Sequence, residues 1–197
     1  ICSQINREIS TRDHDVIKQF QEAISVGNRA VIVAPPGAGK TTIVPLSLLE
    51  SPNVNGQIII LEPRRLAARA AASQMASLLN EKVGETVGFQ IKGLNKVSKQ
   101  TRIVVVTEGI LIRMIQSDQS LPKVGCIIFD EFHERSINAD LGLALSLQVA
   151  EVLRNDLKIL VMSATLDVAP VSKILDTNAP IINCKNNNKR KNLIGFN

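Results

Sequence analysis

Five short apolar runs, separated by segments of helical character, most limit what this chain can fold into. The runs are rich in Val and Ile without in-out alternation, which is typical of strands buried on both faces of a sheet. They are Ala30–Ala34, Gln57–Leu61, Arg102–Thr107, Val124–Phe129 and Lys158–Met162. The intervening helices are expected at about Asp15–Ser25, Lys40–Glu50, Leu66–Leu79, Glu108–Gln116 and Ala139–Leu153. This alternation predicts an α/β fold: a mostly parallel, doubly wound sheet with helices on both faces.

The remaining segments carry weaker signals. Residues 80–101 are polar and are expected to form a loop with a short strand near Val87–Ile91. A length of 197 residues favours one domain over two. From Cys184 onward the composition turns to Asn and Lys, which is typical of a disordered or linker-like end, or of a truncation. We therefore expect one domain over residues 1–183 and a polar, basic tail over residues 184–197.

The net charge of +5 does not by itself indicate a nucleic-acid partner. Residues 185–197 supply four positive charges and no acid, so the rest of the chain carries only +1. The apolar runs are too short to cross a bilayer, and no secretory leader opens the chain. The three cysteines are widely spaced, which disfavours a zinc site or a disulfide framework. A cytoplasmic protein without a membrane partner is therefore expected.

The segment after the first run has the composition of a phosphate-binding loop. Gly37 and Gly39 let backbone N–H groups approach phosphate oxygens, and a helix beginning near Lys40 adds its positive end. Lys40 is expected to reach the β- and γ-phosphates, and the Thr41 hydroxyl to ligate Mg²⁺. The alternative is a Gly/Pro-rich turn that happens to precede Lys-Thr. The expected nucleotide-binding residues are Pro36, Gly37, Ala38, Gly39, Lys40, Thr41 and Thr42.

A pair of carboxylates follows the run Val124–Phe129 directly. Ligands of open parallel sheets bind beyond the carboxyl ends of the strands, where this pair would lie. Asp130 is the candidate for holding Mg²⁺, and Glu131 for orienting and deprotonating an attacking water. The alternative is a strand that simply ends in solvated acids. His133 has no companion ligands, so a metal role for it is disfavoured.

Further segments, together with the loop and the acidic pair, resemble a known family. They are Glu62-Pro63-Arg64-Arg65-Leu66-Ala67-Ala68, Thr107-Glu108-Gly109-Ile110-Leu111, Phe129-Asp130-Glu131-Phe132-His133-Glu134-Arg135-Ser136, and Ser163-Ala164-Thr165. Over about Ala30 to Asp167 the chain resembles the DEAH-box (DExH) helicases of superfamily 2. The resemblance implies a RecA-like P-loop NTPase domain that hydrolyses ATP with Mg²⁺ and couples hydrolysis to movement on RNA or DNA.

The resemblance also assigns roles to individual residues. His133 would act with Lys40, Asp130 and Glu131 in catalysis, linking the phosphate site to the coupling element Ser163, Ala164 and Thr165. The residues that would contact the nucleic-acid backbone are Pro63, Arg64, Arg65, Thr107, Glu108 and Gly109. Without the resemblance, a solvated basic face is the favoured interpretation of the arginines, and a helix cap is an alternative role for Thr107.

Helicases of this kind place ATP between two RecA-like domains, and no segment after Thr165 resembles the second. A second RecA-like domain is therefore an expected partner, and this piece alone should hydrolyse ATP slowly. Five Phe and no Trp or Tyr leave few stacking groups, so backbone phosphates are the expected contacts. Two alternatives remain: a P-loop ATPase of another class with a protein or small-molecule partner, and a non-catalytic binding module that retains the fold.

Overall fold

The computed structural model describes residues 11–34, 40–164, 169–175 and 179–183. An eight-stranded sheet with the order β4-β3-β5-β2-β6-β7-β1-β8 organises this part of the chain. Every pairing is parallel except that of β3 with the edge strand β4. The strands are β1 (Arg29–Val33), β2 (Gln57–Leu61), β3 (Val87–Ile91), β4 (Leu94–Lys96), β5 (Ile103–Val106), β6 (Val124–Phe129), β7 (Lys158–Ser163) and β8 (Ile181–Asn183).

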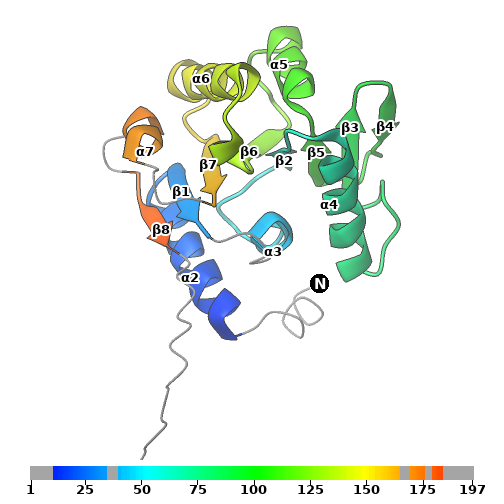
Figure 1. Ribbon diagram of the computed structural model, residues 1–197, viewed down its shortest axis with the longest axis horizontal. Coiled ribbons are helices and arrows are strands. Elements are labelled where there is room, and N and C mark those ends of the chain that lie inside the picture. Colours follow the sequence, from blue (N-terminus) through cyan, green and yellow to red (C-terminus); the bar gives the residue numbers. More distant parts are fainter. Residues whose placement is uncertain (1–10, 35–39, 165–168, 176–178, 184–197) are drawn as a thin grey trace, which may run out of the picture.

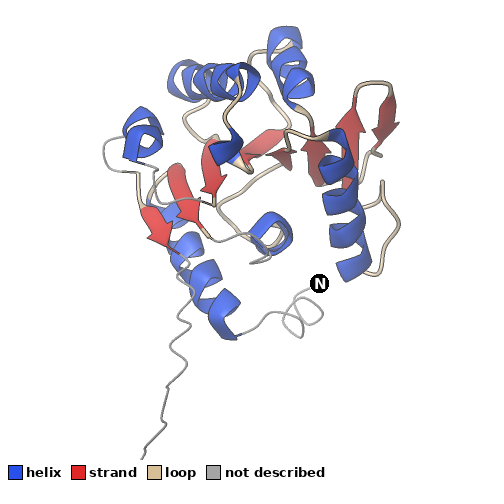
Figure 2. Ribbon diagram, in the orientation of Figure 1, coloured by secondary structure: helices blue, strands red, loops and turns tan. Residues whose placement is uncertain are grey.

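Helices cover both faces of the sheet, as the buried apolar runs predicted (Figures 1 and 2). One face packs against α2 (Thr11–Val26), α3 (Lys40–Leu48) and α4 (Arg65–Leu78). The other packs against α5 (Glu108–Ser117), α6 (Ile137–Val152) and α7 (Ala169–Leu175). Alternate residues of β2 pack into the two cores: Ile58 and Ile60 lie in the first, and Ile59 and Leu61 lie in the second. The prediction of a doubly wound α/β sheet is confirmed.

Parallel pairing brings the carboxyl ends of the strands to one rim. Leu61 is in register with both Val106 and Phe129, and Val33 with Ser163. The residues that follow these strands continue the ladder, since the backbone N–H of Asp130 donates to Leu61 and that of Glu62 donates to Val106. The chain segments that contain the predicted site residues therefore lie together at this rim of the sheet.

The differences from the predicted elements lie mostly at ends and edges. Helix α6 begins at Ile137, two residues earlier than expected, because the Ser136 hydroxyl caps it by accepting from the backbone N–H of Ala139 at 2.9 Å. Helix α3 ends at Leu48, two residues short of the predicted end. The short elements β4, β8 and α7 were not predicted. The expected tail, residues 184–197, lies outside the described residues.

No helix in the described part of the chain has the length and apolar character needed to span a bilayer.

Candidate nucleotide-binding site

Lys40 and the acidic pair meet at the rim of the sheet. Lys40 is the first residue of α3, and its side chain is almost fully buried. Its Nζ lies 3.4 Å from Glu131 Oε1 and donates to the carbonyl of Ala34 at 3.2 Å. A buried ammonium held between a carboxylate and a carbonyl is positioned to exchange either partner for a phosphate oxygen.

Asp130 is buried beside α3, and one of its carboxylate oxygens has no hydrogen-bond partner. Its Oδ1 accepts from the backbone N–H of Glu131 at 2.8 Å, whereas its buried Oδ2 has no hydrogen-bond partner. Burial raises the pKa of Asp130, while the nearby Thr41 hydroxyl and the Glu131 N–H act in the opposite direction. A cation at Oδ2 would satisfy this orphaned oxygen and favour the charged carboxylate.

The residues present fit a Mg²⁺ site of the kind that shares its ion with a nucleotide. Mg²⁺ is commonly held through one or two carboxylates and substrate phosphates, with water completing its shell. Asp130 and the adjacent Thr41 hydroxyl supply such a partial set. Among the described residues, no group of three or more His, Cys, Asp and Glu side chains is arranged to hold a metal unaided.

A second buried carboxyl, Glu62, lies against Asp130 and was not among the predicted site residues. Only 4% of Glu62 is exposed. Burial, followed by the negative charge of Asp130 and contact with its carboxyl, raises the pKa of Glu62 to about 8. This shift in pKa favours the neutral form of Glu62 at neutral pH. The sequence did offer a signal, since Glu62 follows the apolar run Gln57–Leu61 just as Asp130 follows Val124–Phe129.

Replacing Glu62 with Gln is expected to flatten the pH dependence of stability. Because folded Glu62 keeps a proton that the unfolded chain releases near pH 4.5, the free energy of unfolding should fall as the pH rises from 4.5 towards 8. Glu62→Gln removes this proton, so the variant should gain on the order of 1–3 kcal/mol relative to wild type across that interval. Denaturant titrations at several pH values measure it, with the exposed Glu85→Gln as control. Parallel wild-type and Glu62→Gln curves would contradict the prediction.

The turn after Asp130 is held in an unusual conformation. Glu131 adopts φ 47° and Arg135 φ 43°, both in the left-handed region that disfavours side chains. Between them the 3₁₀ turn η1 (Phe132–Glu134) is anchored by Phe132, whose ring meets Phe129 edge-on at 6.1 Å and lies under the Arg135 guanidinium. This packing offsets the backbone strain and fixes where Glu131 points.

His133 connects the acidic pair to the end of β7. Its Nδ1 accepts from the backbone N–H of Ala164 at 3.3 Å and lies 3.3 Å from Glu131 Oε2. One ring nitrogen can accept from Ala164 only when unprotonated and donate to Glu131 only when protonated. Ser163, the preceding residue, is buried. The structure therefore brings His133, Ser163 and Ala164 together, while Thr165 lies outside the described residues.

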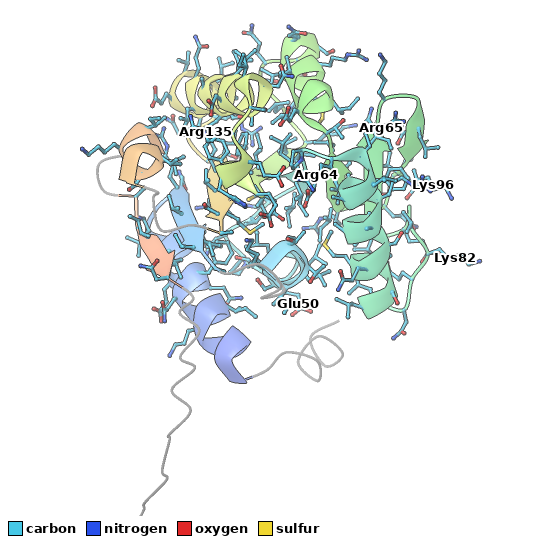
Figure 3. The ribbon with its side chains drawn as sticks, in the orientation of Figure 1. Glu50, Arg64, Arg65, Lys82, Lys96 and Arg135 are labelled. Atoms are coloured by element: carbon cyan, nitrogen blue, oxygen red, sulfur yellow. The ribbon has the colours of Figure 1, made fainter. Side chains whose placement is uncertain are left out.

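The predicted nucleic-acid residues lie where β2 leads into α4 and where β5 leads into α5, and Arg64 and Arg65 are labelled in Figure 3. Arg64 pairs with Glu134 at 2.7 Å, and Arg65 donates to the carbonyl of Lys92 at 2.9 Å. Thr107 is the N-cap residue of α5, but its side chain makes no capping hydrogen bond. The alternative of a simple cap is therefore wrong. Glu108 accepts from the Ser136 hydroxyl at 2.7 Å, which joins α5 to the start of α6.

Three of the remaining predicted residues are placed and four are not. Thr42 is buried in α3, and Pro63 is half-buried before α4. Gly109 is exposed in the first turn of α5. Pro36, Gly37, Ala38 and Gly39 lie outside the described residues.

A parallel sheet with a buried lysine and an acidic pair at its carboxyl rim defines a P-loop NTPase domain of the RecA-like class. The family described as DEAD/DEAH box helicase matches residues 14–174, and the chain belongs to this family.

Similar proteins agree with that assignment. The chain is 52% identical over 167 residues to the ATP-dependent RNA helicase HrpB of Escherichia coli (strain K12), covering 85% of this chain and 20% of that protein. It is 37% identical over 180 residues to the ATP-dependent RNA helicase HrpA of the same organism, covering 90% of this chain and 13% of HrpA. A crystal structure of E. coli DEAH/RHA helicase HrpB matches with a TM-score of 0.84 at 50% identity, covering 88% of this chain and 22% of that one. The chain thus spans about a fifth of HrpB's length.

Proposed function

We propose that this chain is the first RecA-like domain of an ATP-dependent RNA helicase, binding Mg-ATP at the rim and an RNA backbone beside it. The observation that carries the proposal is the meeting of Lys40, Glu131 and Asp130, with the Asp130 Oδ2 atom buried and without a partner. Membership of the helicase family and similarity to HrpB and HrpA, whose names specify RNA, support it.

The residues divide the chemistry between them. Lys40 would leave Glu131 to contact the β- and γ-phosphates, and Pro36, Gly37, Ala38, Gly39 and Thr42 would complete the nucleotide-binding set. Thr41 and Asp130 would hold Mg²⁺, which offsets the phosphate charge. Glu131 would orient a water and take its proton as the water oxygen bonds to the γ-phosphorus. The bond from that phosphorus to the β,γ-bridging oxygen breaks, releasing ADP and phosphate.

Coupling to RNA would run through the turn that carries Glu131. His133 contacts Ala164, so a change at the γ-phosphate reaches the Ser163-Ala164-Thr165 segment. Arg64 and Arg65 present guanidinium groups suited to phosphates, with Pro63, Thr107, Glu108 and Gly109 along the same rim. Charge on the transferred phosphoryl group would be stabilised by arginines of a second RecA-like domain. The buried, free Cys126 is consistent with a cytoplasmic setting.

The decisive experiment is ATP turnover by the complete protein with and without single-stranded RNA. Marked stimulation by oligouridylate is expected, and DNA in parallel tests the choice of strand. ATP turnover that no nucleic acid stimulates would favour a P-loop ATPase of another class. Absence of Mg-ATP binding would favour a non-catalytic module.

Replacing Arg65 with Ala is expected to weaken RNA binding and reduce its salt dependence. Each lost phosphate contact lowers the slope of log affinity against log salt by about 0.7–0.9. Arg69→Ala is the matched control, because Arg69 is an exposed arginine one turn further along α4. Fluorescence anisotropy with labelled oligouridylate at several salt concentrations measures both variants. Equal slopes for Arg65→Ala and wild type would show that Arg65 does not contact an RNA phosphate.

A further inference from the structure

The guanidinium of Arg64 is already occupied by a carboxylate. Arg64 Nη2 lies 2.7 Å from Glu134 Oε1, although 72% of the arginine side chain is exposed. An exposed pair of this kind contributes little to stability, because water and salt screen it. A carboxylate and a phosphate bind a guanidinium through the same donors, so Glu134 and an RNA phosphate compete for Arg64.

Glu134 belongs to the turn that carries the catalytic candidates. It is the last residue of η1, and its backbone N–H donates to the carbonyl of Glu131 at 2.9 Å. Its side chain is only 34% exposed, which limits how far it moves while the turn stays in place. Glu131 in turn faces Lys40, the group expected to receive the nucleotide. One short turn thus joins the nucleotide site to the arginine of the RNA surface.

We propose that Glu134 is a positioning residue that competes with RNA phosphate for Arg64, and that nucleotide binding weakens this competition through the turn that carries both Glu131 and Glu134. The inference rests on the proposed function, since it takes RNA phosphate as the ligand of Arg64. The negative charge of Glu134 also repels an approaching phosphate. Glu134 therefore weakens RNA binding in two ways: it occupies Arg64, and it repels the RNA backbone.

The two binding events are then linked. When nucleotide takes Lys40 from Glu131, the turn loses one of its contacts and the Arg64–Glu134 pair weakens. RNA that captures Arg64 frees Glu134 and favours the same rearranged turn. Linkage requires the two effects to be equal: nucleotide tightens RNA binding by the factor by which RNA tightens nucleotide binding.

The test compares Glu134→Gln with wild type in the complete protein, using labelled oligouridylate with and without a non-hydrolysable ATP analogue. Without nucleotide the variant is expected to bind RNA roughly two- to fivefold tighter, the range expected for an exposed ion pair. With the analogue the gain should vanish, so the nucleotide-dependent change in RNA affinity shrinks by the same factor. Glu134→Asp, which keeps the charge, should remain close to wild type.

Glu151→Gln is the matched control. Glu151 on α6 pairs with Arg29 at 3.2 Å, and Arg29 opens β1, at the opposite end of the strands from the rim. The control removes the same charge from an exposed pair and should leave both RNA affinities unchanged. If Glu151→Gln tightened RNA binding as much as Glu134→Gln, the effect would be one of net charge and the proposal would be overturned.

Arg64→Ala separates this inference from the function on which it rests. In the Arg64→Ala background, Glu134→Gln should no longer tighten RNA binding beyond the effect of one charge. If Arg64→Ala weakens RNA binding but Glu134→Gln acts identically in both backgrounds, the inference fails and the proposed function stands. If Arg64→Ala leaves RNA affinity unchanged, Arg64 does not contact RNA and both the inference and that part of the proposed function fall.

Discussion

Lys40→Ala is expected to lower ATP turnover by at least about 10²–10³-fold, the loss typical of removing one electrostatic group from a transition state. The reason is local: Lys40 is the buried cation beside Glu131, and no other lysine begins α3. Because it would contact phosphates before and during the reaction, nucleotide affinity should fall as well as turnover. Steady-state turnover with RNA present, together with equilibrium binding of a fluorescent ATP analogue, measures the two effects.

The fold should survive this change. Lys40 bonds to the buried carbonyl of Ala34 and approaches the partly exposed Glu131 carboxylate, so its loss leaves one buried carbonyl without this partner, at a cost of about 1–3 kcal/mol. The melting temperature should therefore fall by no more than roughly 10 °C, with the protein still folded at assay temperature. Lys123→Ala removes a lysine from the exposed segment before β6 and serves as the matched control. A Lys40→Ala protein that hydrolyses ATP at the control's rate would refute the assignment of the phosphate-binding loop.

The central strands were predictable because a strand buried on both faces requires a continuous run of apolar residues, which is visible in the sequence. Strands β2 and β6 begin and end at the predicted residues, since their Ile- and Val-rich runs stop abruptly at charged residues. The edge strands β4 and β8 have no such run. All three residues of β4 are exposed, and β8 is only three residues long with one residue buried, so neither strand gives an apolar run of ordinary strand length.

The residues that meet at the rim were predictable where a residue type in a given local context has one common role. Lys40 after a glycine-rich turn and Asp130 after a buried strand are both recognisable locally, and parallel pairing brings strand ends to one rim. The conformation of the turn was not predictable. Glu131 is not a residue type that favours positive φ, and the packing of Phe132 on Phe129 imposes it from outside the local sequence.

The contact between Arg64 and Glu134 could not be predicted from the sequence, because it too depends on the packing of residues that are distant in the chain. The two residues are 70 positions apart, and neither local sequence indicates the other as its partner. Their meeting depends on the β2–β6 register, which sets Leu61 beside Phe129. Periodicity reports which face of an element is buried, but it does not report register between distant strands.

Glu131→Gln is expected to separate nucleotide binding from hydrolysis. The substitution keeps the shape of the side chain and leaves Lys40, Thr41 and Asp130 intact, so Mg-ATP should still bind within about tenfold of wild type. Its amide cannot accept the proton of the attacking water, and loss of a general base lowers turnover by about 10²–10⁴-fold. The pattern differs from that of Lys40→Ala, which should weaken both binding and turnover.

The ion pair between Lys40 and Glu131 sharpens this expectation. Glu131 Oε1 lies 3.4 Å from Lys40 Nζ, so a phosphate that binds Lys40 would have to displace a carboxylate. A neutral Gln holds Lys40 less strongly, and nucleotide affinity should be maintained or slightly increased while hydrolysis stops. Single-turnover hydrolysis and equilibrium binding of an ATP analogue measure the two quantities, with the exposed Glu85→Gln as control. Turnover within a few-fold of that control would exclude Glu131 as the base and require another group to take the proton.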